Sequence, residues 1–147
     1  MSVPSGGSRV LVIEEHPFQR RALVRRLNEL GVPRVLAVAG CADALAYLSA
    51  NARSIALILS SLDMPETDGI ELLRTLGIQA PHIAVAVLTA FDHIPVRRIA
   101  ARAAARGLHL VGVLEKPVSD DALRAVLVRA VSGESCDPML RAGSGYC

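Results

Sequence analysis

Short apolar runs alternate with longer segments of mixed polarity along most of the chain. The apolar runs are rich in Val, Leu and Ile and cover residues 9–13, 34–39, 55–60, 83–88 and 110–114. Near-continuous apolar runs of this length predict strands of a parallel sheet whose two faces are both covered. The segments between the runs show helical apolar spacing, helix propensity or capping residues, which predicts helices over residues 18–30, 43–50, 69–76, 95–106 and 119–131.

Five strand-then-helix units in succession predict an α/β fold, a doubly wound (βα)5 arrangement around a five-stranded parallel sheet. We expect one folded domain over residues 9–132. Residues 1–8 and 133–147 are polar and aperiodic and are interpreted as terminal tails. Ligands of such folds bind at the carboxyl ends of the strands, so the residues that follow each apolar run are the ones to inspect.

Composition favours a protein with one folded domain and argues against membrane-spanning, nucleic-acid-binding and disulfide-rich classes. The chain of 147 residues is 52% hydrophobic, which is enough for one buried core. The longest apolar stretch is far shorter than the roughly 20 residues of a membrane span, and the formal charge of +2 does not favour nucleic acid as a partner. Three cysteines without a CxxC spacing fit neither a disulfide framework nor a zinc site, which favours a cytoplasmic protein.

Reactive or charged residues follow four of the predicted strands. Glu14 and Glu15 follow the first, Ser61 the third and Thr89 the fourth, while Lys116, the only lysine in the chain, follows the fifth. Their motifs in order, EEHP, DMPETDG, TA and KP, closely resemble the receiver domain of bacterial two-component response regulators. The resemblance runs from about residue 9 to residue 131 and implies a flavodoxin-like fold with strand order 2-1-3-4-5.

The resemblance implies a role for each of these positions. Glu14 and Glu15 match the acidic pair that holds Mg²⁺, Thr89 matches the switch hydroxyl and Lys116 the phosphate-contacting lysine. Asp63 matches a position that supplies a backbone carbonyl to the metal, and with Glu14 and Glu15 it forms the predicted acidic pocket, a possible weak metal site. We expect its side chain to point away from the acceptor position. For the two glutamates, weak Mg²⁺ binding and direct pairing with Lys116 both stay open.

Two positions depart from the family pattern. The phosphoacceptor aspartate is replaced by Ser61, a poor nucleophile without an adjacent base, and the aromatic readout position on the fifth strand is Val113. We therefore predict an atypical receiver, or pseudo-receiver, that requires no cofactor and has no enzymatic activity. Two alternatives are a conventional phosphorelay receiver whose acceptor was replaced at Ser61, and a hydrolase that uses Ser61 with His16 or His93.

The predicted mode of action is protein–protein contact in bacterial signal transduction. Receivers attached to EAL-type cyclic-di-GMP phosphodiesterases show the greatest similarity to the HPFQRRALVRRL and GLHLVGVLEKP segments. The resemblance implies a histidine kinase, such a phosphodiesterase or another receiver as partner, or a homodimer through the fourth helix, fifth strand and fifth helix. Three arginines at four-residue spacing on the fourth helix form the candidate partner face, Arg98, Arg102 and Arg106. No membrane association is expected.

Overall fold

The computed structural model describes residues 9–63, 68–90 and 94–139. All strand pairings are parallel, and the sheet has the order β2-β1-β3-β4-β5, which confirms the predicted doubly wound topology. The strands are β1 (Arg9–Ile13), β2 (Val35–Val38), β3 (Ile55–Ser61), β4 (Ala84–Thr89) and β5 (His109–Glu115). Because the strands are parallel, the residues that follow β1, β3, β4 and β5 come together at one edge of the sheet.

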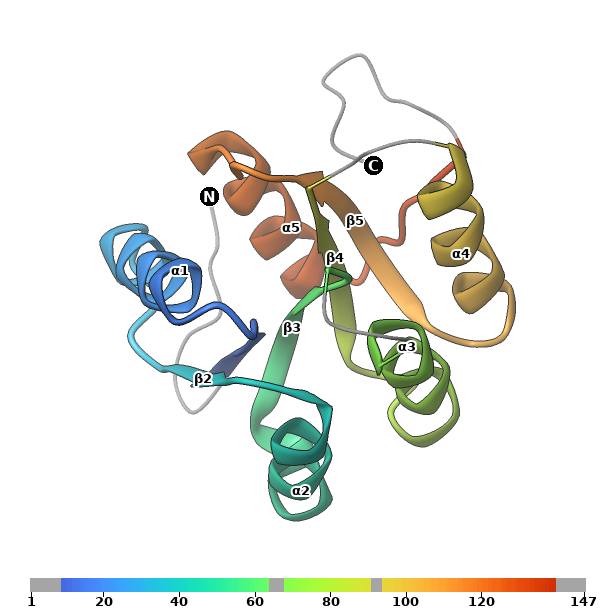
Figure 1. The fold of residues 1–147 in the computed structure, drawn as a ribbon, viewed down its shortest axis with the longest axis horizontal. Coiled ribbons are helices and arrows are strands. Elements are labelled where there is room, and N and C mark those ends of the chain that lie inside the picture. Colours follow the sequence, from blue (N-terminus) through green and yellow to red (C-terminus); the bar gives the residue numbers. More distant parts are fainter. Residues whose placement is uncertain (1–8, 64–67, 91–93, 140–147) are drawn as a thin grey trace.

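Helices cover both faces of the sheet, α1 and α5 on one and α2, α3 and α4 on the other (Figure 1). Their bounds are α1 (Pro17–Glu29), α2 (Cys41–Asn51), α3 (Asp68–Gln79), α4 (Ile94–Ala105) and α5 (Asp120–Ser132), with a short 3-10 turn, η1 (Ala52–Ser54), before β3. The predicted helices are confirmed, and the ends differ by at most three residues, as is usual for helix boundaries.

The side chains of each central strand alternate between two apolar clusters. On β1, Val10 and Val12 pack with α1 and α5, whereas Leu11 and Ile13 pack with α2, α3 and α4. All four side chains are completely buried. Each burial of this kind stabilises the fold by about 1.5–3 kcal/mol relative to an exposed side chain, before the entropy of ordering is subtracted. This two-sided burial explains why the strands read as continuous apolar runs.

The caps of α1 and α5 fix where the loops at the sheet edge end. Ser119 caps α5 by accepting a hydrogen bond from the Ala122 amide at 3.1 Å, as its sequence position predicts. His16 caps α1 through Nδ1, which accepts from the Gln19 amide at 3.4 Å. Gly133 ends α5 in the left-handed conformation, with φ of 81°.

The segment that follows α5, residues 134–139, packs back onto the domain and is called the C-terminal segment below. The Cys136 amide donates to the Leu110 carbonyl of the edge strand β5 at 2.9 Å, and Pro138 is buried. Arg97 of α4 is only 5% exposed and donates to the Pro138 carbonyl at 2.9 Å. The C-terminal segment therefore lies against β5 and reaches α4.

One expectation about the cysteines is wrong. Cys136 is disulfide-bonded. The spacing of the cysteines gave no indication of this, because a disulfide depends on how close two side chains come in space. Among the helices of residues 9–63, 68–90 and 94–139, none has the length and apolar character needed to cross a membrane.

Candidate functional site

The backbone holds the strand-end residues in fixed positions. The Lys116 amide donates to the Thr89 carbonyl at 2.8 Å, and the Leu62 amide donates to the Leu88 carbonyl at 2.7 Å. These bonds continue the parallel pairing by one step beyond β5 and β3. Glu14, Ser61, Asp63, Thr89 and Lys116 thereby come from four separate strand ends into one cluster.

Lys116 is the centre of this cluster. Its Nζ lies 2.6 Å from Glu14 Oε1, 2.9 Å from Ser61 Oγ and 3.1 Å from Gln19 Oε1. It also forms an ion pair with Asp63 Oδ2 at 3.3 Å. Gln19 was not among the predicted site residues, and the only sequence signal for it is its position in the first turn of α1, next to the acidic pair. These acceptors engage the ammonium group from several sides.

Of the two glutamates, Glu14 pairs directly with Lys116, which is one of the two arrangements that the sequence left open. Glu14 is 2% exposed, and its Oε2 also accepts from the His16 amide at 3.2 Å. The Glu15 side chain is exposed, and among the described residues its recorded bond is from Arg20 to its backbone carbonyl, at 3.1 Å. Consecutive residues beyond a strand point in different directions, which the sequence motif does not reveal.

Ser61 is the last residue of β3 and is completely buried. Its Oγ accepts from Lys116 Nζ at 2.9 Å and from the Asp63 amide at 3.3 Å. Both of these groups donate to the hydroxyl oxygen, so among the described residues neither hydrogen-bond partner of Ser61 is a base that could accept its proton. His16 is engaged in capping α1, and His93 lies outside the described residues. This geometry gives no support to the serine hydrolase alternative.

Asp63 contradicts the expectation that its side chain points away from the site. Its Oδ1 accepts from Thr89 Oγ1 at 3.2 Å, and its Oδ2 accepts from the Ala90 amide at 2.6 Å. The bond from the Asp63 amide to Ser61 Oγ turns the loop so that the carboxylate reaches back over the sheet edge. A local turn of this kind depends on backbone angles that a motif of residue types does not specify.

Val113, which the family resemblance places at the readout position, is a core residue. It lies in β5 opposite Val87, is completely buried, and packs in the cluster that also includes residues of α2, α3 and α4. An aliphatic side chain of this size fills the core without a larger ring that could move between buried and exposed positions.

The donor set does not fit a magnesium site. Mg²⁺ prefers several oxygen ligands in a regular octahedron. Here Glu14 and Asp63 are bonded to an ammonium group, Glu15 is exposed, and Ser61 supplies no carboxylate. Among the described residues, no group of three or more His, Cys, Asp or Glu side chains is placed to hold a metal ion.

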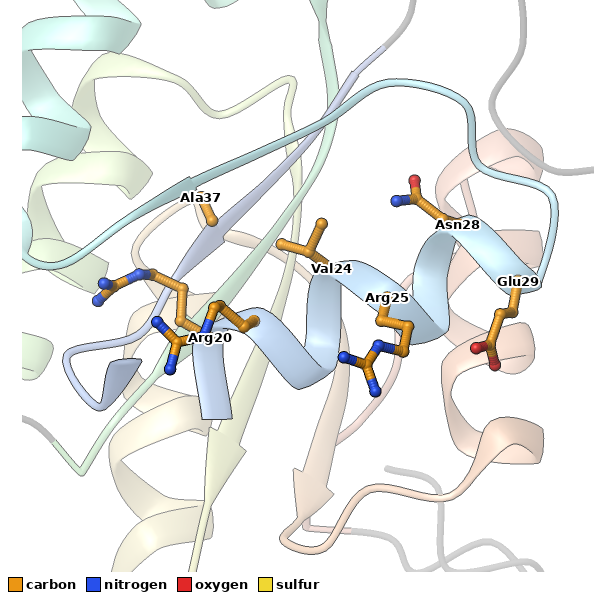
Figure 2. Close-up of a pocket in the computed structure, with 7 residues that line it drawn as sticks. Arg20, Val24, Arg25, Asn28, Glu29 and Ala37 are labelled. Carbon is orange, nitrogen blue, oxygen red and sulfur yellow. The ribbon is translucent and has the colours of Figure 1, made fainter. Parts of the chain in front are cut away.

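Two arginine-rich surfaces lie outside this cluster. A groove of about 580 Å³ runs along α1 beside β2, where Arg20, Arg25 and Val24 line one side and Ala37 the other (Figure 2). The predicted arginine stripe is exposed: Arg98 and Arg102 lie on α4, and Arg106 directly follows its last residue. Arg102 and Arg106 also line a small groove between α3 and α4.

The fold and the cluster of residues at the strand ends define a signalling receiver module. The family model described as "Response regulator receiver domain" matches residues 10–128, so the chain belongs to this family. Fold similarity agrees, since a response regulator receiver domain protein from Clostridium thermocellum aligns with a TM-score of 0.74 at 24% identity. That alignment covers 86% of this chain and 95% of the other.

Two curated relatives are much longer than this chain. The sensor histidine kinase RcsC of Salmonella typhi is 35% identical over 121 residues, which is 80% of this chain and 12% of that protein. The cyclic di-GMP phosphodiesterase RocR of Pseudomonas aeruginosa is 28% identical over 120 residues, which is 82% of this chain and 30% of that protein. The chain thus spans less than a third of either relative, and it is a receiver domain of two-component signalling.

Proposed function

We propose that this domain is an atypical receiver that acts through protein contact, without phosphorylation of an aspartate. The observation that carries the proposal is the pairing at the acceptor position. Ser61 presents a buried hydroxyl that accepts a hydrogen bond from Lys116, and Lys116 is at the same time paired with Glu14. A neutral hydroxyl in this environment has neither the charge nor the neighbouring base that attack on a phosphoryl group requires.

The proposal includes independence from Mg²⁺. Metal binding at Glu14 would have to displace Lys116 from a contact of 2.6 Å, and the same ammonium group is also paired with Asp63 at 3.3 Å. Lys116 thus takes the place that a divalent cation would otherwise fill. A titration with Mg²⁺ and beryllofluoride, an analogue of the phosphoryl group, tests this: the amide signals of Lys116 and Thr89 should not shift in a saturable way.

The proposed partner surface lies on α4 and the turn directly after it and consists of Arg98, Arg102 and Arg106, all three of which are exposed. Support for a protein partner comes from the relatives, which are named as a sensor histidine kinase and a cyclic di-GMP phosphodiesterase. The proposed partners are therefore a histidine kinase, an EAL-type phosphodiesterase or another receiver. A homodimer through α4, β5 and α5 would have to accommodate the C-terminal segment, which already lies against β5.

Charge reversal on α4 tests the partner surface. The triple variant Arg98→Glu, Arg102→Glu and Arg106→Glu should reduce binding to a candidate partner by tenfold or more, because like charges at an interface cost several kcal/mol. Surface plasmon resonance against each candidate measures the loss. The matched control is Arg21→Glu with Arg25→Glu on α1, which should leave binding within about twofold. Equal losses in both variants would remove α4 as the specific surface.

A further inference from the structure

The Asp63 carboxylate sits among three hydrogen-bond donors from two strand ends. Thr89 Oγ1 donates to Oδ1 at 3.2 Å, the Ala90 amide donates to Oδ2 at 2.6 Å, and Lys116 Nζ lies 3.3 Å from Oδ2. Thr89 is 1% exposed, whereas the Asp63 side chain is 31% exposed. The Thr89 hydroxyl therefore lies at the buried side of the site, and the Asp63 carboxylate lies toward solvent.

The three donors are chemically different, but together they can bind the oxygen atoms of one anion. A hydroxyl, a backbone amide and an ammonium group that converge on one point form the type of arrangement that stabilises oxyanions in protein sites. Each oxygen of Asp63 has at least one of these donors, so both acceptor atoms of the carboxylate are used. These three donors together form an oxyanion site. The ligand of this site is the carboxylate of Asp63, two residues after the end of β3.

Ser61 contributes to this arrangement through the loop. Its Oγ accepts from the Asp63 amide at 3.3 Å, which turns the chain directly after β3. The same Oγ accepts a hydrogen bond from Lys116 Nζ. Ser61 therefore contacts both the backbone of Asp63 and the ammonium group that pairs with the Asp63 carboxylate. The residue at the acceptor position thus helps to place Asp63.

We propose that Asp63 is the resident ligand of an oxyanion site formed by Thr89, Ala90 and Lys116, and that it closes the domain to phosphoryl groups and other small tetrahedral oxyanions. This inference rests on the proposed function, in which Ser61 is not phosphorylated, and adds a second reason for the inertness of the site. A tethered group acts at an effective concentration in the millimolar range, so a free anion at lower concentration competes poorly.

Removal of the carboxylate should open the site. In the full chain, Asp63→Ala should bind inorganic sulfate with saturable amide shifts at Thr89, Ala90 and Lys116, while the parent protein shows none at the same concentrations. The double variant Asp63→Ala with Lys116→Met should lose this binding by tenfold or more, because the ammonium group is the only full positive charge among the three donors. Asp121→Ala, which removes an exposed aspartate on α5, is the matched control and should behave like the parent.

Two results would overturn the inference: a folded Asp63→Ala protein without sulfate binding, or a parent protein that binds sulfate equally well. Neither result bears on whether Ser61 is phosphorylated. A saturable response of the parent to beryllofluoride would contradict both the proposed function and this inference. A second measurement uses the isosteric variant Asp63→Asn. Loss of the charged acceptor should speed hydrogen exchange of the Ala90 amide by about tenfold or more, and an unchanged rate would also contradict the proposal.

Discussion

Lys116→Ala should lower the free energy of unfolding by about 3 kcal/mol, because it leaves the buried Glu14 carboxylate without its cation. Glu14 is 2% exposed and lies 2.6 Å from Lys116 Nζ, while the lysine side chain is 16% exposed. Removing one partner of a buried pair costs more than the pair itself contributes, since the remaining charge is neither hydrated nor paired. Urea denaturation followed by circular dichroism measures the change.

Two further variants test whether the loss of stability in Lys116→Ala comes from the unpaired Glu14 carboxylate. Arg124→Ala breaks the exposed pair between Arg124 and Asp121 on α5, and its effect should stay within about 0.5 kcal/mol. Adding Glu14→Gln to Lys116→Ala should recover part of the stability, because the uncompensated charge is gone. If Lys116→Ala were neutral or stabilising, the ion pair could not be the central contact of the site.

Ser61→Asp should convert the site into one that responds to Mg²⁺. Ser61 is completely buried and lies next to Lys116 and Asp63, so the substitution adds a third carboxylate to the cluster. Without metal the variant should be less stable than the parent, because a single lysine then faces three negative charges. A metal that binds only the folded state stabilises it by about 2.7 kcal/mol at a concentration 100 times its dissociation constant.

Thermal unfolding at increasing Mg²⁺ concentration measures this response. The expected result is a saturable rise in the melting temperature of Ser61→Asp and no comparable rise for the parent protein. Ser61→Asn is the control of matched size without charge, and it should behave like the parent. Equal stabilisation of all three proteins by Mg²⁺ would show that the acceptor position does not determine metal binding.

The fold could be predicted from the sequence because its signals are local and repeated. The strands β1, β3, β4 and β5 are largely buried on both faces, so their apolar runs are continuous. Each helix carries its own spacing or cap, as Ser119 does for α5. Parallel strands then bring Glu14, Ser61, Thr89 and Lys116 to one edge. Membership of the site follows from topology, which is why those four residues could be chosen before the structure was known.

The contacts within the site could not be predicted in the same way. The directions of Glu15 and Asp63 depend on the backbone conformation of short loops. In the loop after β3, that conformation includes a hydrogen bond from the Asp63 amide to the Ser61 hydroxyl, which residue types alone do not specify. Gln19 joins the site because α1 begins close to β1. The packing of the C-terminal segment on β5 and α4 depends on single contacts, such as Arg97 with the Pro138 carbonyl.

The central claim is that this receiver domain works without a phosphoryl group at Ser61. The most direct test is an amide NMR titration of the full chain, first with Mg²⁺ and then with Mg²⁺ plus beryllofluoride, following Glu14, Ser61, Thr89 and Lys116. We expect no saturable shift at these residues in either step. A specific, saturable response to beryllofluoride would contradict it, because the site would then still recognise a phosphoryl group.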